Sequence, residues 1–105
     1  MKEIIESLVK FRDERNWKQF HTPENLSRSI VLEAAELLEN FQWQNDNIVL
    51  QNIKDELADI MTYCLLLCEN YQLDPEEIIQ QKMEKNKLKY PIEKSFGKSS
   101  KYSNL

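Results

Sequence analysis

The sequence is poor in the residues that build tight turns. It contains one glycine and three prolines in 105 residues, whereas a β-sheet protein of this size needs many turns rich in these residues. It has no glycine-rich loop that could hold a phosphate group, so any phosphate must be held by side chains or a metal ion. We therefore expect an all-α fold and a single domain covering residues 1–105.

Long apolar runs are also absent, and the few apolar stretches are much too short to cross a bilayer. No secretory signal is visible, because the first residues lead directly into an amphipathic pattern. We expect a cytoplasmic protein that has no contact with membranes.

Cysteine and histidine are scarce, which excludes several kinds of metal site. Cys64 and Cys68 lie one turn apart on the apolar side of an expected helix, where we interpret them as reduced thiols of the core. A ferritin-like di-iron centre would need Glu-x-x-His pairs, but His21, the only histidine, precedes the second expected helix. An EF-hand would need an aspartate-rich loop with a central glycine, which is missing.

Charge is unevenly distributed along the chain, whose net charge is −4. Residues 1–81 carry sixteen acidic and seven basic side chains, whereas residues 82–105 carry seven lysines and two glutamates. An acidic body argues against nucleic acid as a partner, because such binding depends on neutralising phosphates. The basic end can be a simple solvated segment. Beside an acidic, metal-loaded centre it would instead supply cations for a polyanionic ligand.

Apolar periodicity and capping residues predict four helices. Thr22 and Pro23 are a typical N-cap and first-turn proline, and Asp74 begins a capping box. A loop at residues 45–47 offers the cap of the third helix, and the tail 91–105 is expected to be irregular. The expected helices cover residues 2–16, 22–41, 48–70 and 74–89.

The third expected helix has more apolar surface than one core face requires. Leu65, Leu66 and Leu67 point to three sides of it. Because a four-helix unit this small cannot cover all of that surface, we expect a homodimer or a dimer of dimers, which is a homotetramer.

Two pairs of acids, each spaced one helical turn apart, are the most informative motif. Glu33 and Glu36 lie on the second expected helix, and Glu56 and Asp59 lie on the third. In both pairs the first acid borders the apolar stripe and the second stands one step outward. If the helices pack antiparallel through these stripes, four carboxylates converge, which is costly without a counter-ion. All-oxygen ligands of this kind suit Mg²⁺, with Mn²⁺ as an alternative.

A single pair of this kind is common on solvated helix faces and would mean little. The repetition in the same register is what favours a metal site. Glu39, Asp55 and Glu69 map to the outer faces of the helices, and we interpret them as solubilising charge.

Longer motifs surround the acids. They are WKQFHTPENL from Trp17 to Leu26, EAAE from Glu33, FQW from Phe41, ELAD from Glu56, KMEKN from Lys82, KYP from Lys89 and KY at Lys101. Together they resemble the MazG-like all-α nucleoside triphosphate pyrophosphohydrolases, nearest to the dCTP pyrophosphatase branch, over nearly the whole chain. The resemblance implies Mg²⁺-dependent hydrolysis of a nucleoside triphosphate to monophosphate and pyrophosphate, by helical dimers or tetramers.

The resemblance also implies roles for individual residues. The four acids of the two pairs would be the Mg²⁺ ligands, and Glu33 or Glu36 would orient or deprotonate the attacking water. Aromatic residues suit a base pocket because base stacking contributes about 1–3 kcal/mol. The implied base-pocket residues are Trp17, Phe20, His21 and Trp43. Tyr63 would contact the nucleotide, and Lys82, Asn86 and Tyr90 would contact phosphates and sugar.

From the pattern alone, other interpretations stay open. The tryptophans can be packing residues, Tyr63 a tyrosine at the edge of the core, and residues 82–90 a solvated helix end. A non-enzymatic helical oligomerisation or adaptor module would use the acids as surface charge. Hydrolysis of a different phosphoanhydride, such as a dinucleotide polyphosphate, would keep the metal site and change the pocket.

Overall fold

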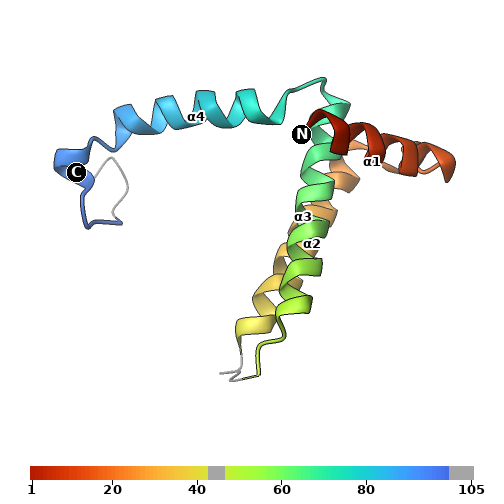
Figure 1. The fold of residues 1–105 in the computed structure, drawn as a ribbon, viewed down its shortest axis with the longest axis horizontal. Helices are drawn as coiled ribbons and strands as arrows, with labels where there is room; N and C mark the ends of the chain where they lie inside the picture. Colours follow the sequence, from red (N-terminus) through yellow and green to blue (C-terminus); the bar gives the residue numbers. More distant parts are fainter. Residues whose placement is uncertain (43–46, 100–105) are drawn as a thin grey trace. The chain divides into compact units, whose positions relative to one another are not determined.

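The computed structural model describes residues 1–42 and 47–99 of the chain. No strand occurs among these residues, so the all-α prediction is confirmed. They divide into two compact units, Met1–Leu73 and Asp74–Leu105, which are described separately. Within the same ranges, no helix combines the length and the apolarity that a membrane span requires. The elements are α1 (Lys2–Glu14), the 3-10 helix η1 (Lys18–Phe20), α2 (Pro23–Gln42), α3 (Leu50–Asn70), α4 (Pro75–Lys89) and α5 (Ile92–Ser95), labelled in Figure 1 where space allows.

The first unit is built on an antiparallel pair of long helices, α2 and α3, with α1 packed against α3 (Figure 1). The antiparallel pairing agrees with the prediction. The Thr22 hydroxyl oxygen accepts a hydrogen bond from the backbone N–H of Asn25 at 3.1 Å, so the expected N-cap of α2 is confirmed.

The core between these helices is small. Leu26, Leu65 and Leu66 are buried, and Leu26 exposes only 1% of its surface. The apolar stripes of α2 and α3 are only partly covered in this single chain, because Phe41 on α2 and Leu57 on α3 stay exposed. The half-buried members of the stripes are Ile30, Leu37, Ile53 and Ile60.

Two helix boundaries, the start of α3 and the end of α1, differ from the prediction by two residues. α3 begins at Leu50, two residues later than expected, and its N-cap is Val49, which makes no side-chain capping bond to the described residues. Residues 45 and 46, part of the expected capping loop, lie outside the described residues. α1 ends at Glu14, two residues earlier than expected. Asn16 adopts a left-handed conformation with φ of 56°, which ends the helical path of the chain.

The second unit begins at Asp74, whose predicted role as the N-cap of α4 is confirmed. Asp74 Oδ1 accepts from the backbone N–H groups of Glu76 at 2.9 Å and Glu77 at 3.4 Å, and Pro75 occupies the first turn of α4. The short helix α5 forms where irregular chain was expected. Its N-cap is Pro91, whose φ of −62° is compatible with a helix start.

Candidate active site

Three of the four predicted acids come together between α2 and α3. Glu33, Glu56 and Asp59 each offer one carboxylate oxygen, and these oxygens all lie within 4.8 Å of one another. Opposite ligands of Mg²⁺ are about 4.2 Å apart, so small side-chain adjustments bring the three oxygens to one ion. The antiparallel packing creates this group, because Glu33 borders the stripe of α2 and Glu56 that of α3.

The carboxyl groups of Glu33 and Glu56 lie close together between α2 and α3. The Oε2 atoms of both residues are buried and have no hydrogen-bond partner among the described residues. The pKa of Glu33 is raised from 4.5 to about 7, chiefly because a proton on its carboxyl can bridge to Glu56. Burial and the neighbouring carboxylates of Glu36 and Asp59 contribute to the same increase. Two buried, unpartnered carboxylate oxygens are what a hard divalent cation would satisfy.

The raised pKa of Glu33 predicts how metal-free protein responds to pH. Between about 4.5 and 7 the folded state holds a proton that the unfolded state has released. Folding stability therefore decreases as pH rises through this window, and the melting temperature should fall by a few degrees between pH 5 and pH 7.5. Melting curves with a chelator present measure it, and the Glu33→Gln variant should flatten the profile. A melting temperature that rises over the same window would contradict this prediction.

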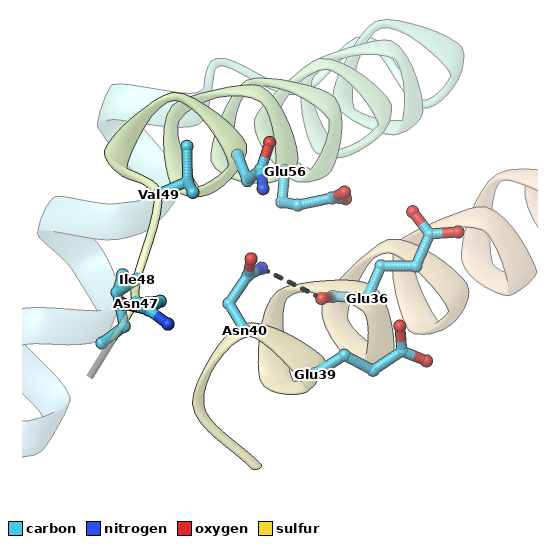
Figure 2. A pocket seen from close by; sticks show the side chains of 8 residues that line it. Glu36, Glu39, Asn40, Asn47, Ile48, Val49 and Glu56 are labelled. Carbon is cyan, nitrogen blue, oxygen red and sulfur yellow. Dashed lines mark hydrogen bonds between the residues drawn. The ribbon is translucent and has the colours of Figure 1, made fainter. Parts of the chain in front are cut away.

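Glu36 stands beside the three-acid group and also lines a polar pocket next to it. The pocket has a volume of about 420 Å³. Figure 2 shows Glu36 extending from α2 and Glu56 from α3. Asn40 lies one turn after Glu36, and its side-chain N–H donates to the Glu36 carbonyl oxygen at 3.2 Å. Glu36 is exposed, so its carboxylate is accessible to a ligand. The other lining residues are Glu39, Asn47, Ile48, Val49 and Asn52.

A second pocket, of about 200 Å³, joins the acids to aromatic side chains. Asp59 lines it together with Trp17, His21 and Tyr63, three residues that the resemblance assigned to the nucleotide. The rings of Trp17 and His21 meet edge to face, with centroids 6.5 Å apart. A flat ligand in this pocket would thus have aromatic rings and a carboxylate around it. The remaining lining residues are Leu8, Phe11, Arg12, Thr62 and Leu66.

Electrostatics set the protonation of the two polar rings in this aromatic pocket. Burial lowers the pKa of His21, and the charge of Arg12 lowers it further, so the imidazole is neutral at pH 7. Burial raises the pKa of Tyr63, and so do the carboxylates of Glu33, Asp59 and Glu36. The tyrosine phenol therefore stays protonated as a hydrogen-bond donor. These charge effects place Tyr63 within electrostatic reach of the acids, as its spacing from Asp59 predicted.

The roles predicted for these residues stay predictions, and so do those of the remaining site residues. Phe20 is 60% exposed and is not among the described residues that line the aromatic pocket. Trp43 lies outside the described residues. Lys82 and Asn86 lie on α4 and Tyr90 is its C-cap, all within the second unit.

Two residues of α1 that line the aromatic pocket, Arg12 and Phe11, were not predicted as site residues, and the role of one acid, Glu69, was predicted wrongly. Arg12 falls on the apolar face of α1, one turn after Leu8, and a charge in such a stripe signals a buried ion pair. Its Nη1 donates to Glu69 Oε2 at 2.8 Å. The interpretation of Glu69 as outer-face charge was therefore wrong, because this half-buried carboxylate pairs with a guanidinium from another helix. Phe11 has no comparable signal, yet its ring packs edge to face on Trp17 with centroids 5.8 Å apart.

Comparisons with known proteins identify a matching family, similar sequences and a similar structure. Residues 28–105 match the model of the MazG-like family. The chain is 33% identical to mouse dCTP pyrophosphatase 1 and 32% identical to the human protein, and each match covers 92% of the chain. It spans only 62% of the length of either relative. A solved pyrophosphatase structure from Archaeoglobus fulgidus superposes with a TM-score of 0.80 at 41% identity, covering 87% of this chain and 92% of that one.

Proposed function

The chain belongs to the MazG-like family, and on this premise we propose that it hydrolyses a nucleoside triphosphate to the monophosphate and pyrophosphate. The observation that carries the proposal is the position of Asp59, which belongs both to the three-acid group and to the aromatic pocket. A nucleotide has the same layout, with an anionic chain at one end and a flat ring at the other. The names of the mouse and human relatives favour dCTP or a similar nucleotide as substrate.

Glu33, Glu56 and Asp59, with Glu36 beside them, would hold Mg²⁺ or Mn²⁺. The fit rests on the donor set, which is all oxygen, and on the two buried carboxylate oxygens that lack a partner among the described residues. When bound, such an ion would neutralise negative charge on the triphosphate during its hydrolysis.

The residues of the chain itself would orient the nucleotide and deprotonate the attacking water. Glu33 or Glu36 would orient the attacking water or take its proton, and Glu36 is the more exposed of the two. Attack at the α-phosphorus breaks its bond to the bridging oxygen, and pyrophosphate leaves. Trp17 would stack on the base and the Tyr63 phenol would donate a hydrogen bond to the nucleotide. Lys82 and Asn86, with Tyr90, would reach the phosphates and sugar as the family resemblance implies.

A screen of ribo- and deoxyribonucleoside triphosphates with Mg²⁺ tests this function. Only attack at the α-phosphorus yields monophosphate and pyrophosphate in equal amounts, so both products should be quantified. Release of inorganic phosphate, or turnover of dinucleotide polyphosphates alone, would indicate a different phosphoanhydride substrate. The absence of any hydrolysis would favour the non-enzymatic helical module.

We further propose that the enzyme works in the cytoplasm as a homodimer or homotetramer. Large apolar side chains on α2 and α3 are exposed in the single chain, including Val31 at 67%, Leu32 at 63% and Met61 at 54%. Val31 and Leu32 line an apolar groove of about 380 Å³ with Ser27 and Arg28. Apolar surface of this extent supports association through these helices.

The Leu32→Glu variant should weaken this assembly, because it places a charge on the apolar surface of α2. Light scattering coupled to size-exclusion chromatography should then give a smaller mass than for the unmodified protein. Gln80→Glu is the control, since it adds the same charge at an exposed position of α4 that is already polar. The proposed interface would be wrong if Leu32→Glu kept the full mass.

A further inference from the structure

The segment from Trp17 to His21 carries two walls of the aromatic pocket but has little structure of its own. Only Lys18–Phe20 form a helical turn, and its N-cap makes no side-chain bond to the described residues. The segment follows the left-handed residue Asn16. A single 3-10 turn is weakly held by its own hydrogen bonds, so contacts with other elements must fix the positions of Trp17 and His21.

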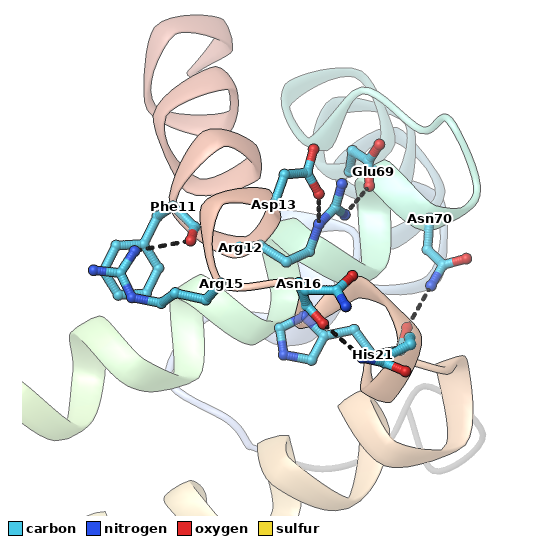
Figure 3. Close-up of polar contacts among 9 residues, drawn as sticks. Phe11, Arg12, Asp13, Arg15, Asn16, His21, Glu69 and Asn70 are labelled. Atoms are coloured by element: carbon cyan, nitrogen blue, oxygen red, sulfur yellow. Dashed lines mark hydrogen bonds and ion pairs between the residues drawn. The ribbon is translucent and has the colours of Figure 1, made fainter.

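Arg12 holds the beginning of this segment. The backbone N–H of Trp17 donates to the Arg12 carbonyl oxygen at 3.0 Å. The Arg12 side chain is 5% exposed, and its Nε donates to Asp13 Oδ1 at 2.9 Å. Its Nη1 reaches Glu69 on α3, as Figure 3 shows. A buried guanidinium is held in place by such partners, because losing one leaves an uncompensated charge. Arg12 is thereby tied to α3, and Trp17 with it.

Asn70 holds the end of the segment. Its side-chain Nδ2 donates to the His21 carbonyl oxygen at 3.0 Å (Figure 3). Asn70 directly follows Glu69, so two consecutive residues of α3 reach the two ends of the segment. The same helix carries Asp59 and Tyr63, which line the same pocket. The spacing between these two residues and the rings of Trp17 and His21 is therefore set along one helix.

We infer that Glu69 and Asn70 are positioning residues of the nucleobase pocket, which fasten Trp17 and His21 at a set spacing from Asp59 and Tyr63. Neither residue needs to touch the nucleotide. They would control the affinity for the base, and the preference among bases, by fixing the positions of the Trp17 and His21 rings. The acids proposed to act on the triphosphate would stay in place. This inference rests on the proposed function of the site.

Steady-state kinetics of Asn70→Ala test the inference on the triphosphate that the screen identifies. KM should rise about fivefold, the effect of one lost hydrogen bond, while kcat stays within about twofold. The preference for the best nucleobase over the second best should decrease. Glu69→Gln keeps an oxygen that accepts from Arg12 but loses the charge, so its KM should rise about threefold. Asn70 is exposed, so Asn70→Ala should fold normally.

Gln51→Ala is the matched control. It also removes one side-chain amide hydrogen bond from α3, that of Gln51 Nε2 to Asp55 Oδ1 at 2.9 Å, away from the described lining of the aromatic pocket. Its KM should equal that of the unmodified protein. A spectroscopic readout uses Trp43→Phe protein, in which Trp17 is the sole tryptophan. Adding Asn70→Ala should shift its emission to longer wavelength and increase its quenching by acrylamide.

An Asn70→Ala enzyme with unchanged KM, or with kcat reduced as much as kcat/KM, would overturn the inference. Unchanged Trp17 fluorescence would overturn it as well. Failure of the proposed function looks different, because the unmodified protein would then hydrolyse no nucleoside triphosphate in the screen.

Discussion

Replacing Asp59 by asparagine should reduce kcat/KM for triphosphate hydrolysis by about a thousandfold, in keeping with the loss of a group that stabilises transition-state charge. The substitution keeps the shape of the side chain and removes its charge from the three-acid group. Because Asp59 also lines the aromatic pocket, the change affects the point where the two halves of the site meet. Initial rates at saturating and limiting triphosphate, with titrated Mg²⁺, measure the effect. Calorimetric Mg²⁺ binding should weaken in parallel.

Asp55→Asn provides the control for this experiment. Asp55 lies one turn earlier on α3, is exposed and accepts from Gln51, so its loss removes one negative charge from the same helix outside the acid group. Its activity should stay within about twofold of the unmodified enzyme, because exposed charges contribute little. Full activity in Asp59→Asn would rule out the proposed metal site, and an equal loss in both variants would point to net charge instead.

Replacing Trp17 by leucine should raise KM by about tenfold to a hundredfold, because base stacking on an aromatic ring contributes about 1–3 kcal/mol. The variant keeps an apolar side chain but removes the flat surface that lines the aromatic pocket together with Tyr63 and His21. The substitution should change mainly KM, since Trp17 lies outside the acid group that we propose to act on the phosphates. Kinetics with triphosphates that carry different bases would also show that the variant discriminates less between these bases.

Trp17→Phe separates stacking from packing in the same position. Phenylalanine retains a flat ring beside Phe11, so its KM should lie much closer to that of the unmodified enzyme. If leucine and phenylalanine gave the same KM, stacking of the base on this residue would be excluded.

Local signals predicted most of the fold. Apolar periodicity placed the helices, and the caps at Thr22 and Asp74 placed the starts of α2 and α4, because each cap is a contact between residues close in sequence. The start of α3 was missed because Val49 offers no polar side chain that would mark it. The helix at residues 92–95 is a single turn, too short to produce a periodic pattern.

The candidate site was predictable where helical register alone determines it. The acids of α2 and α3 border their apolar stripes, so antiparallel packing brings them together. The contribution of α1 was not predictable, because the pattern of one helix does not say which residues of another it meets. Phe11 beside Trp17, and Arg12 with Glu69, are contacts of this kind. They join residues far apart in the chain or separated by a turn.

The neighbouring carboxylates of Glu33 and Glu56 would couple the proposed ion binding to the stability of the α2–α3 hairpin. An ion held by both acids would act as a cross-link between the helices, and opening the hairpin would dismantle its coordination shell. By thermodynamic linkage, an ion present at a hundred times its dissociation constant would stabilise the closed hairpin by about 2.7 kcal/mol. Cellular magnesium would then serve as a folding ligand of this protein even when no nucleotide is bound.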